Sequence, residues 1–331
     1  MRVRAVRIAT LLAVVATFSA FTLRAALAFP TFSDWPSRGV KIIVPFPAGS
    51  SDDIAARLYA QGLSRRWFRP VVVENKPAAD AVVVPAAFAN ANDDHTLLYA
   101  TSSMIIADEL SRGPLADRPM LDLIPIAAAA SAVIVVAAAH DVPARSLKEL
   151  VELVRSKPGE FTWAGGPSLP HFVFAATVRR HQLEMKHVRY QDDTTPEPDL
   201  DARRVHVLCN SLHALSAPIG KEKARILAVT SPQRERMLPD VPTVAEAGFP
   251  EMEIEALSGL FGWRNMPPEL RDRIAADMRA VADDPIFHDR LQTTGQRVRT
   301  GRPAEFATAI GRQRIRIQQI MHIIDLKSAE K

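Results

Sequence analysis

The sequence has almost no cysteine: Cys209 is the only one in 331 residues. A single cysteine cannot form a disulfide within the chain, nor can it build a zinc site with the Cys-x₂-Cys spacing. Because Cys209 ends the apolar run Val205–Cys209, we interpret it as a small buried hydrophobic side chain and not as a nucleophile. A disulfide-stabilised framework is therefore excluded, and a thiol enzyme is not indicated.

Glycine is also scarce, with 14 residues, and the motifs that depend on it are missing. The sequence contains no Gly-Lys-Ser/Thr phosphate-binding loop, no Gly-x-Gly-x-x-Gly dinucleotide fingerprint and no Gly-x-Ser-x-Gly nucleophile elbow. The nine histidines are scattered, and none has the spacing of a metal site. We therefore expect no cofactor, no metal and no catalytic residues.

Beyond residue 28 the chain has no excess of either charge. The formal net charge of +4 comes from four arginines in the first 28 residues, and without them 37 basic side chains face 37 acidic ones. Binding to nucleic acid needs a basic surface or a concentrated basic stripe. The charge balance therefore argues against nucleic acid as a partner.

No apolar run reaches the roughly 20 residues that a membrane-spanning helix needs. The N-terminal run Ile8–Phe21 follows three arginines and precedes Ala26-Leu27-Ala28. A basic start, an apolar segment and small residues in this order are typical of a secretory signal peptide. A membrane anchor is the alternative, and the shortness of the run argues against it. We predict that residues 1–28 are removed by cleavage near Ala28 and that the rest is exported in soluble form.

Short apolar segments then alternate with amphipathic ones, which is typical of an α/β protein with mostly parallel strands covered on both faces. Helix starts are predicted by two capping boxes, Ser146–Glu149 and Thr243–Glu246, and by Pro268 and Pro303. The predicted strands are 40–44, 71–73, 96–100, 132–138, 161–164, 187–190, 205–209 and 226–229.

The segment Val40–Arg57 predicts a strand, a tight loop and a helix. At the N-terminus of a helix, free N–H groups and the partial positive charge favour an anion by roughly 0.3–1 kcal/mol at an exposed site. In the alternative interpretation, Ser50 or Ser51 only caps the helix, while Asp52 and Asp53 complement its dipole. The spacing alone leaves both a carboxylate site and a simple cap open.

Several segments together resemble one protein family. The most specific is Arg236–Gly248, and the resemblance extends over essentially all of the chain after residue 28. The family is that of the Bug-type extracytoplasmic solute receptors, the binding components of tripartite tricarboxylate transporters. The other matching segments are Val44–Gly49 with Asp53 and Arg57, Val72–Pro77, Asp94–Leu98, His187–Tyr190, Asp199–Leu200, Arg204–Val205 and Leu227–Ser231.

The resemblance implies a bilobal periplasmic-binding-protein fold of type II-like form, with two α/β domains around a ligand cleft and hinge crossings between them. It implies that residues 29–133 and 231–331 form a discontinuous first domain and residues 134–230 a second. With the export signal, it implies a monomeric binding protein in the periplasm of a Gram-negative bacterium, and not an enzyme.

The resemblance also implies which residues bind the ligand. The family holds a carboxylate between a loop after the first strand and a facing loop of the second domain. Phe46 and Trp163 would form apolar walls, while hydroxyls and backbone N–H groups would hold the carboxylate. Carried over to this chain, the site comprises Phe46, Ala48, Gly49, Ser50, Ser51, Asp52, Asp53, Ser102, Trp163, Gly165, Gly166, Ser168, His171 and Asp192.

Some of these positions depart from the family pattern. Asp52 stands where relatives usually have a threonine, and its charge repels an anion unless the side chain points away or meets a ligand amine. Pro167 and Pro170 cannot donate a backbone N–H from the facing loop. Arg189 stands where a proline is usual. These departures leave the ligand class open.

We therefore expect a receptor that captures a small carboxylate, either an organic acid or an amino-acid-like solute. Its partners would be inner-membrane transport subunits or a sensor. One alternative is a receptor that serves signalling without transport. Another is an exported hydrolase, which would need a nucleophile and a base within hydrogen-bond reach in the cleft.

Overall fold

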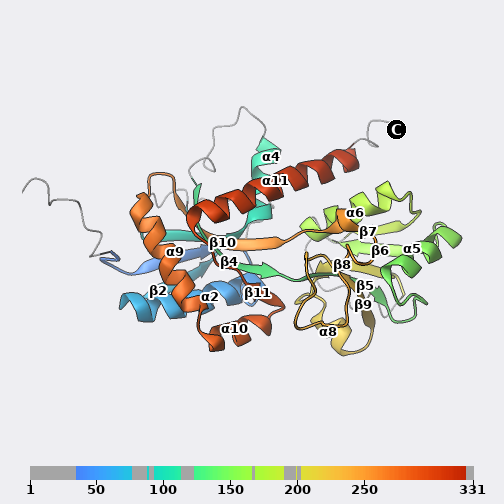
Figure 1. Cartoon of the computed structure of the whole chain (residues 1–331), viewed down its shortest axis with the longest axis horizontal. Coiled ribbons are helices and arrows are strands. Elements are labelled where there is room, and N and C mark those ends of the chain that lie inside the picture. The colour runs from blue at the N-terminus through green and yellow to red at the C-terminus, as the bar shows by residue number, and fades with distance from the viewer. Residues whose placement is uncertain are drawn as a thin grey trace, which may run out of the picture. The chain divides into compact units, whose positions relative to one another are not determined.

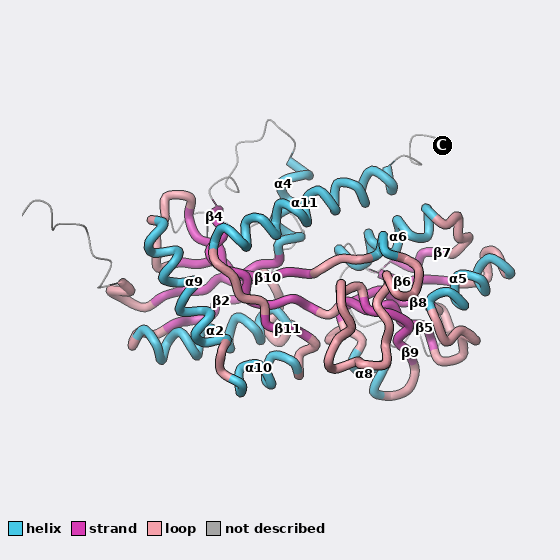
Figure 2. Tube along the Cα trace, in the orientation of Figure 1, coloured by secondary structure: helices cyan, strands magenta, loops and turns pink. Residues whose placement is uncertain are grey.

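The structure is a computed structural model that describes residues 35–76, 88, 93–112, 123–165, 168–189, 199 and 203–325. The predicted signal peptide lies outside these ranges. The described chain forms two β-sheets with helices packed on them (Figures 1 and 2). Within it, no helix is both long enough and apolar enough to cross a membrane.

The first sheet has six strands in the order β11-β4-β10-β3-β1-β2. The parallel part consists of β1, β2 and β3, and β10 lies antiparallel between β3 and β4. β11 pairs antiparallel with the outer edge of β4. The bounds are β1 Val40–Val44, β2 Val71–Asn75, β3 Thr96–Thr101, β4 Leu123–Ala132, β10 Ala256–Trp263 and β11 Gln296–Val298.

Helices cover both faces of this sheet. On one face α2 (Ser51–Trp67) packs against α9 (Pro268–Ala282) and α10 (Pro285–Gln292), and on the other α4 (Ser102–Arg112) packs against α11 (Pro303–Asp325) (Figure 1). Neighbouring residues of a strand point to opposite faces. Accordingly, Ser258 of β10 meets α2, whereas Gly259 lies against Phe306 of α11.

The second sheet has five strands in the order β7-β6-β8-β5-β9. Strands β6, β7 and β8 are parallel, and β5 is antiparallel to both β8 and β9. The strand bounds are β5 Ile134–Ala139, β6 Thr162–Gly165, β7 Lys186–Arg189, β8 Val207–Ser211 and β9 Ala224–Val229. The accompanying helices are α5 Leu147–Ser156, α6 Leu169–Arg180, α8 Ser216–Gly220 and the 3₁₀ turn η3 Pro250–Met252.

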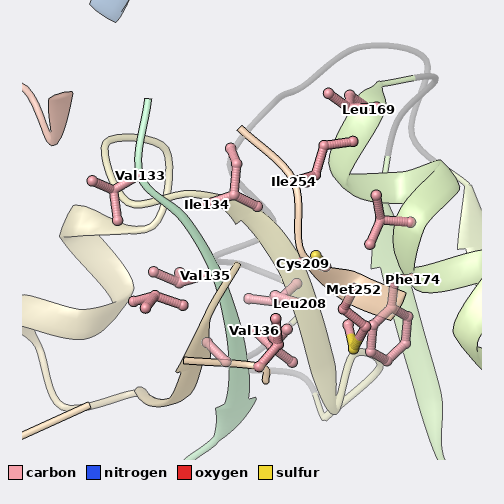
Figure 3. Close-up of a cluster of buried hydrophobic side chains, with 14 of the residues drawn as sticks. Val133, Ile134, Val135, Val136, Leu169, Phe174, Leu208, Cys209, Met252 and Ile254 are labelled. Atoms are coloured by element: carbon pink, nitrogen blue, oxygen red, sulfur yellow. The ribbon is translucent and has the colours of Figure 1, made fainter. Parts of the chain in front are cut away.

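The core of the second sheet includes Cys209, in contact with residues from distant parts of the chain. Figure 3 shows it beside Leu208, Phe174 of α6, and Met252 and Ile254 from the segment before β10. Burial raises the pKa of the Cys209 thiol to about 12, so the thiol stays protonated and serves packing. This agrees with the interpretation of Cys209 as a small hydrophobic side chain.

The chain passes between the sheets at two places. Between β4 and β5 only Val133 intervenes, and its backbone bonds Gly295 on the side of β11 and Leu212 on the side of β8. The second passage, residues 230–255, first stays with β9: Val244 N–H donates to Val229 O at 2.8 Å, and Thr230 N–H donates to Ile134 O at 3.0 Å. Arg297 of β11 forms ion pairs with two residues of this segment, Glu235 at 3.3 Å and Glu255 at 3.2 Å.

Most predicted strands occur close to their predicted bounds, but the expectation of mostly parallel strands holds only for β1–β3 and β6–β8. Strands β4, β5, β9, β10 and β11 enter antiparallel pairs. A strand buried on both faces is apolar whatever its direction, so the pattern of apolar residues could not reveal which strands are antiparallel. The Thr243–Glu246 capping box does form its two hydrogen bonds, at 2.8 and 3.1 Å, but encloses turns instead of a helix.

Two glycines provide a test of the packing between β10 and α11. A Cβ on Gly259 would lie 2.4 Å from Ala127 O and 2.6 Å from Phe306 Cζ, whereas a Cβ on Gly311 of α11 would meet nothing within 4 Å. We expect Gly259→Ala to lower the free energy of unfolding by roughly 1–3 kcal/mol or more through overpacking. Gly311→Ala should raise it by roughly 0.5–1 kcal/mol. Urea unfolding of both variants checks this, and a stabilised Gly259→Ala would contradict the packing described.

Candidate functional site

The loop after β1 is shaped by a tight turn. Ser50 N–H donates to Pro47 O at 3.2 Å, and Gly49, the third residue of this turn, has φ +86°, a conformation that favours glycine. Ser50 is the N-cap of α2, because its hydroxyl accepts from Asp53 N–H at 3.3 Å. The cap predicted as one of two alternatives is therefore present. Phe46 is half-buried beside the turn, and Ala48 and Gly49 are exposed.

The carboxylate of Asp53 holds this loop in place through hydrogen bonds. Its carboxylate accepts from Gly49 N–H at 2.9 Å, from Arg57 Nε at 3.0 Å and from Asn75 Nδ2 at 2.7 Å. Burial by itself would raise the pKa of Asp53, but the hydrogen bonds from Arg57, Gly49 and Asn75 and the charge of Arg57 outweigh it and lower the pKa. With its lone pairs taken up inside the protein, Asp53 positions the loop instead of offering itself to a ligand.

The cap leaves two donors free. The N–H groups of Ser51 and Asp52 begin α2, and neither finds an acceptor among the described residues. Ser50, Ser51 and Asp52 are all partly exposed. A ligand oxygen at this point would receive hydrogen bonds from free N–H groups and the favourable end of the helix dipole. Cap and anion site are thus compatible, since the cap uses only the N–H of Asp53.

The side chain of Asp52 turns toward the sheet. Both Ser258 of β10 and Tyr99 of β3 lie close enough to its carboxyl to interact with it. Burial raises the pKa of Asp52 to about 6, against the opposing effect of the Ser258 hydrogen bond. The Tyr99 hydroxyl is fully buried and lies close to Ser258.

On the second sheet, three rings stack beside the end of β6. Trp163 lies 4.2 Å from His187 of β7 and 5.0 Å from His171 of α6, measured between ring centroids, and the two imidazoles are 4.7 Å apart. Gly165 packs tightly against His171, because a Cβ at this position would lie 3.1 Å from His171 Nδ1. The side chains of Trp163 and His171, both predicted as site residues, therefore meet here, and His187 joins them.

Both imidazoles of this ring stack are held neutral. Burial lowers the pKa of His171 to about 4, assisted by the repulsion that a protonated His187 would exert and by the charge of Arg189. Burial also lowers the pKa of His187, assisted by Arg189 and opposed by a contact between His187 Nε2 and Gly165 O at 3.3 Å. The stack therefore consists of flat, neutral rings and contains one buried nitrogen, His171 Nδ1, that has no hydrogen-bond partner among the described residues.

The remaining predicted site residues fall into three situations. Ser168 is the N-cap residue of α6, and its hydroxyl makes no capping hydrogen bond. Ser102 is fully buried, and its hydroxyl contacts Leu257 O at 3.0 Å and Gln313 of α11, so it joins elements and we leave it out of the site proposed below. Gly166, Asp192 and Pro167 lie outside the described residues. Among those described, no His, Cys, Asp and Glu side chains group into a metal site.

Three residues of these two clusters were not predicted from the sequence: Ser258 and Tyr99 on the first sheet, and His187 on the second. Ser258 and Tyr99 lie on the same face of the sheet as diagonal neighbours only because β10 returns antiparallel to β3, with Ser258 opposite Thr101 and Leu260 opposite Tyr99. His187 comes beside Trp163 through the parallel register of β6 and β7. Register between strands far apart in sequence leaves no local signal, so only His187, in a predicted strand after Trp163, could have been suspected.

The neutral ring stack predicts a pH dependence of stability. An unfolded histidine has a pKa near 6.5, whereas His171 in the folded protein has one of about 4. The unfolded chain then binds more protons between these values, so stability is full above about pH 6.5 and falls as the pH decreases toward 4. In His171→Phe, which keeps a ring but cannot titrate, this fall should be shallower. The measurement is chemical unfolding at several pH values, and His288→Gln, at an exposed position, is the control. If the free energy of unfolding changes with pH equally in His171→Phe and in the original protein, the argument is refuted.

The comparisons with known proteins agree on one family. The sequence model of the family described as tripartite tricarboxylate transporter family receptor matches residues 55–326. The match begins just after the segment Gly49–Asp53. BugT of Bordetella pertussis (strain Tohama I) is 32% identical over 246 residues, which are 73% of this chain and 74% of BugT.

Solved structures show the same fold. One described as the structure of a periplasmic transporter has a TM-score of 0.75 and 27% identity, and the match covers 87% of this chain and 97% of that one. A protein of R. palustris solved with adipate also has a TM-score of 0.75, at 24% identity, over 88% of this chain and 98% of its own. The two sheets therefore form the α/β fold of bilobal periplasmic binding proteins, and the chain belongs to the receptors of the tripartite tricarboxylate transporter family.

Proposed function

We propose that this chain is a periplasmic receptor that captures a small carboxylate and presents it to inner-membrane transport subunits. The observation that supports this most directly is the pair of free N–H groups at Ser51 and Asp52, on a loop that Asp53 braces. Free N–H groups at a helix start bind carboxylate oxygens without a formal positive charge. The R. palustris protein of the same fold, solved with adipate, supports this ligand chemistry.

The facing side of the site, in this proposal, is the ring stack of Trp163, His171 and His187. Neutral imidazoles can donate one hydrogen bond to an acidic ligand without adding charge. Arg189 ends β7 opposite Gly165 and is exposed, and its charge acts on both histidines. It would attract an anion toward this side. Phe46 and Trp163 contribute apolar surface, and the Ser168 hydroxyl is available as a further contact.

The domain division is part of the same proposal. We take the two sheets as the cores of two domains, with one crossing at Val133. Because residues 230–254 remain hydrogen-bonded to β9 and Ile134, the second crossing is placed near Glu255, later than residue 230. Closure about these crossings would bring the α2 loop and the ring stack onto one ligand. Export with removal of residues 1–28, and a monomeric state, belong to the proposal as well.

The alternatives receive less support from the site. An exported hydrolase needs a serine paired with a base. Ser50 caps α2, Ser102 bonds Leu257 O and Gln313, and the Ser168 hydroxyl makes no hydrogen bond to a histidine or a carboxylate among the described residues. We therefore propose binding without catalysis. A receptor that signals without transport would use the same ligand site, and the experiment below applies to it unchanged.

The role of one backbone donor can be tested by comparing two variants that lose the same side-chain hydroxyl but differ in the backbone N–H. Proline is well accepted as the first residue of a helix, and Ser50, with φ −64° and ψ 159°, has the extended conformation required before proline. We expect Ser51→Pro to keep the fold but weaken carboxylate binding at least tenfold, because it deletes one free N–H. Ser51→Ala, which keeps that N–H, should lose clearly less.

The measurement is a thermal-shift series with mono-, di- and tricarboxylates, amino acids and neutral controls on protein purified from the periplasm. Ligand at a hundred times its Kd stabilises the native state by about 2.7 kcal/mol. Titration calorimetry with the most stabilising compound then compares the two Ser51 variants. If Ser51→Pro binds as well as Ser51→Ala, the N-terminus of α2 is not the carboxylate site.

A further inference from the structure

The ring stack of Trp163, His171 and His187 lies at the edge of the second sheet. Trp163 of β6 pairs directly with His187 of β7, and β7 is the outermost strand. The two rings are 4.2 Å apart between centroids, with an interplanar angle of 20°, so each turns a flat face to the other. The stack therefore runs outward along the direction of strand pairing and ends at His187, beyond which the described sheet has no strand.

The inner part of the stack is anchored in the core, whereas its outer part reaches solvent. Trp163 is 4% exposed and packs against Phe174 of α6 at 5.2 Å between ring centroids. His171, also from α6, lies 5.0 Å from the indole. His187 remains partly exposed. A rigid series of aromatic rings thus ends in an accessible imidazole.

An arginine follows this imidazole on the same face of β7. Side chains two residues apart on a strand point to the same side, so Arg189 lies next to His187, roughly 7 Å along the strand. Its neighbour across the strand pair is Gly165, which has no side chain. Arg189 is exposed and makes no hydrogen bond or ion pair with another described residue. A flat ring and an unpaired guanidinium therefore stand side by side.

A ligand that matches both groups carries an anionic group and a planar ring. Burial, assisted by Arg189, lowers the pKa of both imidazoles, so neither adds a positive charge near neutral pH. The guanidinium can bind a carboxylate by charge-assisted hydrogen bonds. A neutral imidazole can bind a further ring by stacking, which a saturated chain cannot do.

We propose that the second sheet selects carboxylates that carry an aromatic ring, which stacks on His187 while a carboxylate meets Arg189. This inference rests on the function proposed above and specifies its ligand class. The ligand ring continues the series that Trp163 and His187 begin. An aliphatic carboxylate meets the arginine but gains nothing from the stack. A ring with two carboxylates on opposite sides leaves the second one for the free N–H groups of α2.

The test uses pairs of acids that differ in the ring alone. Benzoate is compared with cyclohexanecarboxylate, and benzene-1,4-dicarboxylate with trans-cyclohexane-1,4-dicarboxylate, by titration calorimetry at neutral pH on protein purified from the periplasm. Stacking predicts that the aromatic member of a pair binds roughly two- to tenfold more tightly. Burial of apolar surface by itself predicts no such preference, because the saturated ring carries more hydrogen atoms and has at least as much apolar surface.

Two variants at one position assign the preference to His187. His187→Leu removes the ring and keeps an apolar side chain of similar size, so the ratio of the two affinities should fall to about one. The affinity for the saturated acids should stay as it was, which also shows that the variant is folded. His187→Phe, which has a ring again but no group that titrates, should restore the preference.

The charge is tested separately from the ring. Arg189→Gln should weaken both members of a pair equally, by roughly two- to fivefold at low salt, because it removes a charge that each carboxylate meets. Lys186→Gln is the matched control. It removes the same charge from the same strand, but Lys186 is exposed on the opposite face of β7, so both affinities should stay unchanged.

Each other outcome overturns a defined statement. Equal affinity for aromatic and saturated acids, or an aromatic preference that persists in His187→Leu, overturns the role of the ring stack and leaves the proposed function intact. The same holds if only aliphatic carboxylates of the thermal-shift series bind. Arg189→Gln that binds as well as Lys186→Gln overturns the role of Arg189. If no carboxylate of either kind binds, the proposed function fails and the inference fails with it.

Discussion

The buried carboxylate of Asp53 is the interaction on which the site depends. It joins the turn at Gly49, the first helix at Arg57 and the second strand at Asn75. Asn75 in turn donates to Phe46 O at 3.1 Å, so Asn75 holds the start of the loop and Asp53 holds the turn at Gly49, and these two side chains are themselves hydrogen-bonded. The free N–H groups of Ser51 and Asp52 can stay open to solvent because the loop around them is held by these bonds and needs no ligand to order it.

Much of this arrangement could be predicted from the sequence, because its signals are local. The strand Val40–Val44, the glycine turn and the Ser50 cap are consecutive in sequence, and Pro268 and Pro303 open helices as expected. The role of Asp53 could be predicted less well: a ligand contact and a helix-dipole residue were both in view, whereas its partner Asn75 lies on another strand. The same holds for Ser102, whose partners come from β10 and α11.

What the sequence could not provide is strand direction and register. The six-stranded sheet receives β10 and β11 from the C-terminal part of the chain, and β10 enters antiparallel between β3 and β4. Ser258 meets Asp52, and Gly259 meets Phe306, because of that return. Apolar strands buried on both faces carry no alternation that would fix these pairings. The sequence showed that Asp52 and Arg189 depart from the family pattern. It did not show which groups surround them.

The two sides of the proposed site avoid formal charge in different ways. On the first sheet, a helix terminus presents N–H dipoles, and the nearest arginine is already neutralised by Asp53. On the second, desolvation keeps His171 and His187 neutral. A carboxylate brought into such a site finds few full counter-charges, so the charge that Asp52 adds to it matters more than it would on an exposed surface.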